Sequence, residues 1–390
     1  MSNKAPYIQV VLKDTRTDLS QYIDYFKFEQ DMDKDNLLEF KMAHKDNKEM
    51  IDLIDTADLN TGKYLKFHFG YLGDQVSENK VARISNFKPK YAKLVNAIVQ
   101  ALDKGAELKK NKPKTIWEDK TSSQIAIEIA RAYSMTFEVD PTTKIWDSLP
   151  QGDKSDFEFL QEMADKEPDN YVFYIQGDKL LFKKIGLEKI AKFLYSYGDP
   201  DLIHFLPSIE ETKDKDGEAS QVTAKGYDPR KKSSVSATSK NSQTKLGANS
   251  YHYDYDVNGN EKKVMDKPVF IPTDDKEELQ NTADSKQKKA NLNVITAELK
   301  VQGNPLLEVG ELVTIKKVSK KFEGNWLISR VTQVILGGST YTTICKLKKN
   351  GANKPLSKGN EEGRANKTVG RTNPEATKKI YNYDVDGNAK

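Results

Sequence analysis

Residues 303–347 carry the pattern that most constrains the fold of this chain. Apolar and polar side chains alternate within residues 312–315 and again within residues 327–331. A strand with this period buries one face and exposes the other. Turn signals separate the segments: Gly303-Asn304-Pro305, Gly310, Glu323-Gly324-Asn325 and Gly337-Gly338. The region is therefore predicted to form short antiparallel strands of a small barrel or sandwich.

A second set of short strands is predicted for residues 7–102. Polar turns separate six segments rich in β-branched and aromatic residues, which favours a barrel or sandwich over a parallel sheet. The predicted strands are residues 7–12, 23–30, 36–42, 64–71, 81–87 and 94–99, and residues 49–55 are predicted as a short helix.

Between residues 115 and 185 the hydrophobic period changes. A hydroxyl side chain at Thr121 precedes an apolar stripe with helical spacing, and Ser155 precedes another. Residues 171–175 and 179–184 flank Gln176-Gly177-Asp178, which predicts a hairpin. This region is predicted to be a small α+β unit between two β regions.

Strands are predicted again at residues 202–209, 221–227 and 293–301. The intervening polar residues contain too little apolar surface to offset the entropy of ordering them. Removing about residues 232–288 is therefore expected to leave the strands on both sides folded. The predicted division is residues 1–102 for a first β region, 103–200 for an α+β domain, 201–228 with 291–350 for a second β region, 229–290 for a polar, flexible insertion and 351–390 for a polar tail.

The charge balance excludes an evident nucleic-acid footprint. Lys+Arg 62 against Asp+Glu 58 gives a net charge of +4, with both signs interspersed along the chain. The basic runs at residues 109–112 and 230–232 are expected to be solvated loops. Acidic pairs such as Asp31 with Asp33 are likewise expected to lie on solvated turns.

The single cysteine, Cys345, excludes an internal disulfide and suits a reducing compartment. Its position in an alternating strand predicts a small buried hydrophobe rather than a reactive thiol. The first residues lack the apolar segment of a signal peptide, and no stretch has the ~20 consecutive apolar residues of a membrane span. The protein is therefore expected to stay inside the cell until it is released, without inserting into a membrane.

No catalytic constellation or cofactor site stands out. The four histidines are widely separated, and His68 and His204 fall within predicted strands, where a hydrogen-bonded histidine is ordinary. No Gly-x-Ser-x-Gly elbow occurs. The tryptophans could be sugar-stacking platforms, but core or interface anchors are the favoured interpretation; they are Trp117, Trp146 and Trp326.

One short phrase occurs twice. Residues 255–260 are echoed by residues 383–388, and both copies end in an Asn-Gly or Asp-Gly turn signal. Asp384, Asp386 and Asn388 are oxygen ligands at alternating positions, so a calcium loop is possible. Because the closing Glu of such a loop is lacking, a reused docking turn is the favoured interpretation.

Several phrases, taken in order along the chain, resemble the late control protein D family, the baseplate hub proteins of contractile phage tails. The most recognisable are Ser155–Ala164 and Gly177–Phe182, joined by Phe26–Asp31 and Gly226–Pro229. The resemblance covers roughly residues 7–228 and 291–350.

That resemblance implies a mainly β fold with an α+β insert, in which two tail-tube-like antiparallel β-barrels accompany a small α+β domain. It further implies a homotrimer whose six barrels form a ring between the six-fold tail tube protein above and the three-fold spike protein below. Other baseplate proteins and the tape-measure protein are implied partners. Such a hub is not an enzyme, binds no cofactor and does not recognise nucleic acid, although DNA can pass through its channel. Its location is the tail baseplate of the virion, after assembly in the host cytoplasm.

Two alternatives remain open from the sequence. The same hub role could belong to a phage-derived contractile injection system or tailocin. A tail-associated cell-wall hydrolase is the alternative from another class, and it needs a pair of acidic residues or a metal site on a compact domain.

Overall fold

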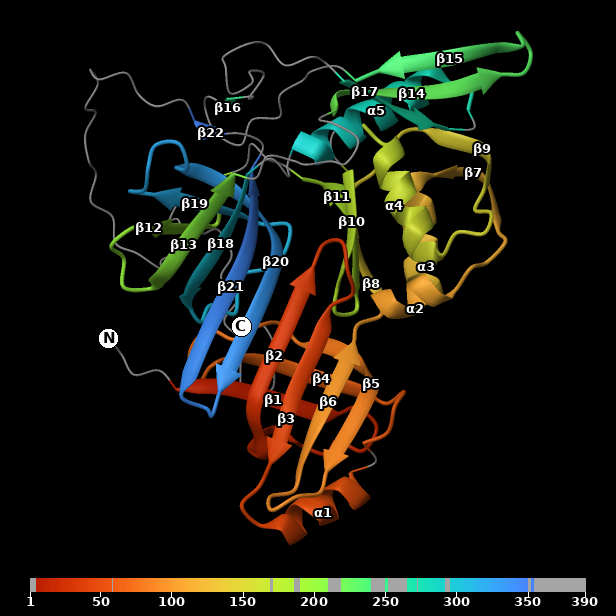
Figure 1. The fold of residues 1–390 in the computed structure, drawn as a ribbon. Helices are drawn as coiled ribbons and strands as arrows, with labels where there is room; N and C mark the ends of the chain where they lie inside the picture. The colour runs from red at the N-terminus through yellow and green to blue at the C-terminus, as the bar shows by residue number, and fades with distance from the viewer. Residues whose placement is uncertain are drawn as a thin grey trace.

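One mostly antiparallel sheet of twelve strands runs through two lobes of the molecule (Figure 1). The structure is a computed structural model. It describes residues 5–57, 59–168, 171–185, 190–209, 219–239, 250–251, 265–271, 273–291, 295–349 and 352–353. The prediction of a mainly β chain with an α+β insert is confirmed.

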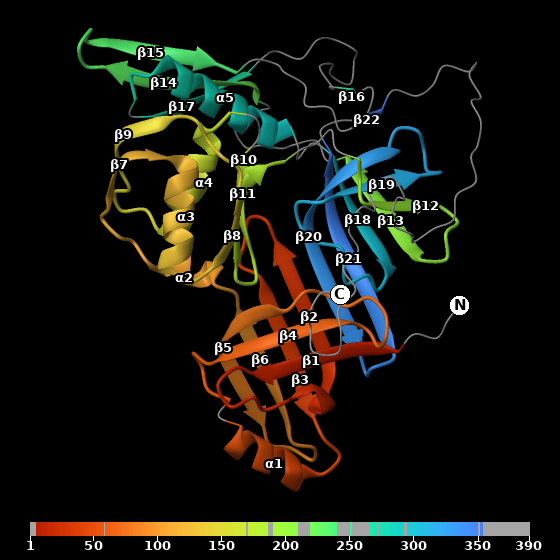
Figure 2. The same ribbon diagram turned by 180° about the vertical axis from the view of Figure 1, so that it is seen from behind.

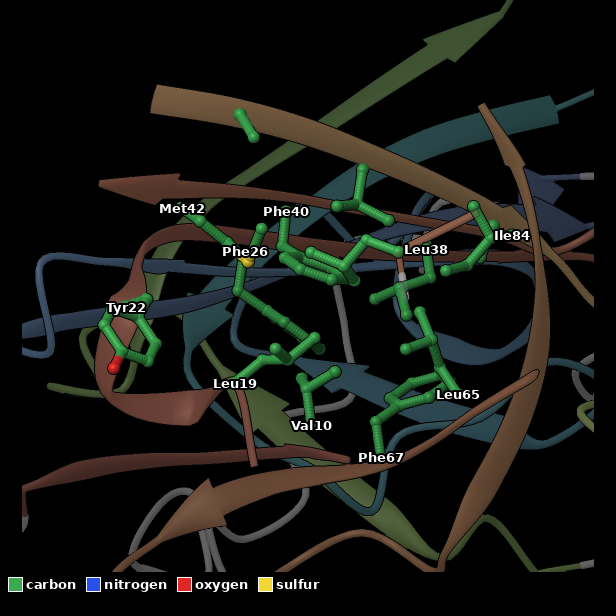
Figure 3. Packing of buried hydrophobic residues seen from close by; sticks show 14 of the residues in the cluster. Val10, Leu19, Tyr22, Phe26, Leu38, Phe40, Met42, Leu65, Phe67 and Ile84 are labelled. Atoms are coloured by element: carbon green, nitrogen blue, oxygen red, sulfur yellow. The ribbon is translucent and has the colours of Figure 1, made fainter. Parts of the chain in front are cut away.

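The first lobe contains the six strands that the sequence predicts near the N-terminus. They pair in the order β1-β4-β5-β6-β3-β2, and the helix α1 covers one end of the lobe (Figure 1). Phenylalanines dominate the core, where Phe26, Phe40 and Phe67 point toward one another (Figure 3). The bounds are β1 Pro6–Leu12, β2 Ile23–Asp31, β3 Leu37–Ala43, α1 Asn47–Thr56, β4 Tyr64–Tyr71, β5 Lys80–Lys90 and β6 Asn96–Leu102.

The second lobe also contains six strands of the sheet, and they pair in the order β12-β19-β20-β21-β18-β13. If the strands of each lobe are numbered along the chain, both lobes have the order 1-4-5-6-3-2. Each lobe encloses its own core, and Trp326 is the largest side chain of the second. The bounds are β12 Phe193–Ser196, β13 Leu202–Ile209, β18 Ile295–Gln302, β19 Leu312–Lys316, β20 Gly324–Leu336 and β21 Thr340–Lys349.

The two lobes also share the positions of their irregularities. The register between strands 2 and 3 shifts around Asp24 in the first lobe and around Ile203 in the second. Strand 5 shifts against strand 6 around Ser85 and around Ser329 respectively. Because bulges bend a strand and increase its local twist, matching bulges give the two lobes matching curvature. They also align the lobes residue by residue.

The middle domain packs α3 and α4 against a short sheet, as predicted. Both helices begin with a complete capping box, formed by Thr121 with Gln124 and by Ser155 with Glu158. The predicted hairpin is confirmed as β10 and β11. The bounds are α2 Gly105–Lys110, β7 Ile116–Thr121, α3 Ser122–Ala132, β8 Thr136–Val139, β9 Ile145–Pro150, α4 Asp156–Lys166, β10 Tyr171–Gln176 and β11 Lys179–Lys184.

Part of the segment predicted as a flexible insertion forms strands and a helix. A three-stranded sheet in the order β15-β14-β17 carries α5 on one face and projects beyond the middle domain (Figures 1 and 2). Strand β14, predicted in the second barrel, belongs to this small sheet. Leu279 and Ala283 are four residues apart in α5 and fully buried, and they were missed within a polar composition. The bounds are β14 Ala219–Asp228, β15 Ser233–Thr238, β17 Met265–Phe270 and α5 Lys276–Asn291.

Candidate functional site: the seam between the two lobes

The lobes join where β2 pairs with β20, in register from Tyr25 opposite Leu336 to Asp31 opposite Arg330. On the same edge of β20, residues Gly324–Leu327 pair with β19 of the second lobe. The bulge at Ser329 lies where the partner of this edge changes from β19 to β2. The Ser329 carbonyl accepts a hydrogen bond from the backbone N–H of Met32 at 3.1 Å. A single long strand therefore belongs to both lobes and holds them in one sheet.

A buried polar cluster lies on the inner face of this seam. The Gln333 Oε1 accepts hydrogen bonds from the Tyr341 hydroxyl at 2.9 Å and from Thr343 Oγ1 at 2.6 Å. Its Nε2 donates to the Asn304 carbonyl at 3.1 Å, so both ends of the amide are satisfied. A Cβ added to Gly303 would lie 2.1 Å from the Tyr341 ring, which explains the glycine in the Gly303-Asn304-Pro305 turn. Satisfied buried polar groups of this kind fix one register of the strands.

The outer face of the seam is polar and charge-paired. The Arg330 guanidinium lies 2.6 Å from Asp31 Oδ2 and 3.6 Å from Glu29 Oε1, and Lys27 pairs with Glu29 at 3.1 Å. Farther along the same face, His204 pairs with Glu298 at 3.1 Å. We call the outer face of β3, β2, β20, β21 and β18 the polar band. The expectation that Asp31 is solvated is wrong, because Asp31 is 6% exposed and pairs with Arg330.

The hairpin of β10 and β11 brings the middle domain to the end of the first lobe. The Asn36 Nδ2 donates to Asp103 Oδ2 and to the Ile175 carbonyl, each at 2.7 Å. Asp103 is 3% exposed. Burial, reinforced by the nearby charge of Asp35, raises the pKa of the Asp103 carboxyl well above its usual range. The Asn36 amide therefore joins the first lobe to the middle domain, and the buried Asp103 carboxyl holds that amide in place.

A buried ion pair ties the first lobe to the loop that precedes β19. The Lys80 Nζ lies 2.7 Å from Glu308 Oε1, and the lysine side chain is 6% exposed. Burial opposes ionisation of Glu308, but the adjacent Lys80 ammonium outweighs it and lowers the pKa of that carboxyl. The Gln176 Nε2 of the β10–β11 turn also approaches Glu308, at 3.4 Å. All three parts of the molecule therefore meet at Glu308.

The residues singled out by the sequence are structural where the structure describes them. Cys345 is fully buried in the second core, and burial raises the pKa of its thiol, so the predicted small hydrophobe is confirmed. Trp326 and Trp146 are buried and Trp117 is half-buried, which confirms the core-anchor interpretation. The calcium-loop candidates Asp384, Asp386 and Asn388, and their echo at residues 255–260, lie outside the described residues.

Catalytic geometry is sparse in the described part of the chain. No group of three or more His, Cys, Asp or Glu side chains there could hold a metal ion. A cavity of about 220 Å³ beside β5 and α2 is lined in part by Arg83, Glu107 and Lys110. The Arg83 guanidinium is 4.0 Å from Glu107, so these charges offset one another. Among the helices described, none is long and apolar enough to cross a membrane.

Comparison with protein families gives one match over most of the chain. The model described as the Alg8 N-terminal domain matches residues 40–336, which include β20 of the seam and parts of both lobes but not β2. The chain belongs to the Alg8 N-terminal domain family. This model differs from that of late control protein D, so the resemblance to that family stays a prediction from the quoted phrases. No curated protein matches the sequence.

Solved structures show the fold of this member of the Alg8 N-terminal domain family in phage tail proteins. The tail protein from Neisseria meningitidis MC58 aligns with a TM-score of 0.63 at 12% identity, over 89% of this chain and 97% of that one. The 43 kDa tail protein of prophage MuSo2 from Shewanella oneidensis gives 0.64 at 12% identity, over 89% and 99%. A chain of the lidded Francisella PdpA-VgrG complex gives 0.50 at 10% identity, over 93% of this chain and 56% of that one.

Proposed function

We propose that the chain is the structural hub of a contractile tail baseplate. Three copies form a ring of six lobes that joins the six-fold tail tube to the three-fold spike and surrounds the channel. The fold shared with two phage tail proteins over nearly their whole length supports a tail role. The hub position itself rests on the resemblance to late control protein D.

The repeated strand order is the observation that carries the proposal. Each chain contributes two lobes with the order 1-4-5-6-3-2, and one continuous sheet joins them. A ring of three such chains presents six similar lobes to one neighbour and three identical chains to the other. This arrangement reconciles the two symmetries without requiring six separate subunits.

The polar band supports the assignment of this face to the channel wall. Charges near the seam pair with one another, as Arg330 does with Asp31 and Lys27 with Glu29. A hydrated wall with paired charges has little net attraction for a passing polyanion. This agrees with a channel through which DNA moves without being recognised.

The proposed location is the virion tail baseplate, with tube, spike, tape-measure and other baseplate proteins as partners. The alternative setting, a contractile injection system or tailocin, is supported by the fold shared with the PdpA-VgrG chain. The hub role is the same in either setting.

Mass photometry of the purified chain, alone and with its cognate spike protein, tests the proposal. The expected species has three times the 44.2 kDa chain mass. A chain that stays monomeric with tube and spike proteins present would contradict the hub role. Zymography on purified peptidoglycan tests the hydrolase alternative, which cleared bands would favour.

A further inference from the structure

Several strand edges lack a strand partner in the described part of the chain, and two of them, one in each lobe, correspond to the edges that form the seam. Strand β13 pairs with β18 on one side only. Strand β5 pairs with β4 through Lys80–Arg83, and its remaining residues on that edge have no strand beside them. In the first lobe the counterpart of β13 is β2, and in the second lobe the counterpart of β5 is β20. These counterparts are the two strands that form the seam.

The shared bulges fix which residues correspond. Aligning Ser85 with Ser329 places Lys90 on Val334 and Tyr91 on Ile335. Aligning Ile203 with Asp24 places Phe205 on Phe26 and Leu206 on Lys27. The alignment also brings Glu39-Phe40-Lys41 onto Glu298-Leu299-Lys300, through the pairing of strands 3 and 6.

We infer that β13 of one copy pairs antiparallel with residues 87–91 of the next copy, repeating between chains the seam that β2 and β20 form within one. The register of this contact is taken from the corresponding pairs of the seam. Lys27 lies opposite Val334 and Phe26 opposite Ile335, so Leu206 is expected opposite Lys90 and Phe205 opposite Tyr91. The inference rests on the proposed ring and specifies its closing contact.

The exposure of these residues fits a contact that is still open in the single chain. Tyr91 is 63% exposed, whereas its counterpart Ile335 is 1% exposed inside the seam. Leu206 and Ile203 are 57% and 51% exposed on β13. Large apolar side chains gathered at an unpaired sheet edge mark an interaction site. A second copy supplies the matching edge.

Two prolines make this edge selective. Pro207 and Pro89 correspond to Phe28 and Gln333, which lie opposite each other in the seam. The Met32 N–H to Ser329 carbonyl bond and the alternation of antiparallel pairing make Phe28 and Gln333 a hydrogen-bonded pair. Each proline lacks the backbone N–H that this hydrogen-bonded pair requires, so side-chain packing must supply most of the contact. An arbitrary strand therefore gains little from adding to either edge.

Engineered cysteine pairs test the contact and its register in the full-length chain. Leu206→Cys with Lys90→Cys should give disulfide-linked dimers and trimers under mild oxidation and non-reducing electrophoresis. The matched control, Lys27→Cys with Val334→Cys, occupies the corresponding positions of the internal seam and should cross-link within one chain. A register control, Leu206→Cys with Lys88→Cys, should cross-link at least tenfold less, because the diagonal pair is farther apart.

Each outcome decides separately for the contact and for the ring. A linked ladder that ends at the trimer, together with an intramolecular bond in the control, supports the inference. If mass photometry shows a trimer but the Leu206→Cys, Lys90→Cys variant forms no link between chains, the contact is overturned and the hub role stands. A ladder that continues past the trimer would contradict the three-chain ring, and equal linkage in the register control would overturn the proposed contact.

Discussion

The two lobes have the same strand order but differ in how their edges are used. In the first lobe the edge of β2 is covered by β20 of the same chain, whereas the corresponding edge of β13 is open in the described part of the chain. Their cores differ as well, since aromatic side chains fill the first and aliphatic side chains around Trp326 fill much of the second. One strand order therefore serves both for internal cohesion and for an outward-facing contact. The strand order is the same in both lobes, and the side chains at each edge determine whether that edge pairs within the chain.

The largest difference between the lobes should appear at Phe26 and its counterpart Phe205. Phe26 is fully buried, so Phe26→Ala should cost about 3–5 kcal/mol of unfolding free energy. Phe205 is half-buried beside Trp326, and Phe205→Ala should cost about 1–2 kcal/mol in the monomer. Denaturant unfolding of both variants measures the contrast. Equal losses would show that the edge of β13 is already as enclosed as that of β2.

The next largest loss of unfolding free energy is expected from breaking the buried ion pair of Lys80 with Glu308. Lys80→Met leaves the Glu308 carboxylate buried without its cation and should lower the unfolding free energy by about 3 kcal/mol. The second lobe has Gly324 at the corresponding position, so it lacks this tie. Lys80→Met with Glu308→Met should recover most of the loss in the same denaturant experiment. A double variant as unstable as Lys80→Met alone would contradict this account.

The ends of strand 6 should give the lobes opposite pH responses. Asp103 corresponds to Lys349, which is buried beside Trp326 and donates to the Glu323 carbonyl at 2.6 Å. Burial lowers the pKa of Lys349 to about 8. Between pH 8 and the unfolded-state pKa the unfolded chain holds the extra proton, so stability should rise with pH. The raised pKa of Asp103 reverses the sign on the acid side, where stability should fall as pH rises from the unfolded value toward the folded one.

Unfolding free energies across this pH range, compared with Lys349→Met and Asp103→Asn, isolate the two contributions. Each variant should flatten the slope in its own window and leave the other window unchanged. A wild-type slope that survives Lys349→Met above about pH 8 would assign the response to other groups.

The smallest effect is expected from excising the projecting sheet and α5. Ile209 lies opposite Ile295, so β13 and β18 can be joined directly, as residues 32–36 join β2 to β3. Replacing residues 211–293 with a linker of about five residues should change the unfolding free energy of the lobes by less than about 1 kcal/mol. The excision also removes the ion pairs of Glu278 with Lys166 and Lys144, so a small loss in the middle domain is expected. Insoluble protein would show that the lobes depend on this module.

Local features of the fold could be predicted from the sequence, because they depend on neighbouring residues. Thr121 and Ser155 precede helices with capping boxes, and the Gln176-Gly177-Asp178 turn joins a hairpin. Long-range pairing could not be predicted. Asp31 pairs with Arg330, 299 residues away, and a partner so distant in the sequence gives no local signal.

The repeated lobe was expected from the resemblance, but its alignment came from the structure. Corresponding positions share few side chains, with Ile84-Ser85 against Ile328-Ser329 among the exceptions. These short matches were the sequence signal for the repeat. They are too brief to be detected without the strand registers that the structure gives. The candidate site was missed for the same reason, since its residues come from both ends of the chain and meet only in the sheet.

Electron-microscopy class averages of the assembled protein, viewed along its symmetry axis, test the central claim most directly. The account predicts a closed ring of six similar densities from three chains, with three middle domains projecting from it. A ring with three lobes, or with six lobes built from six chains, would contradict it.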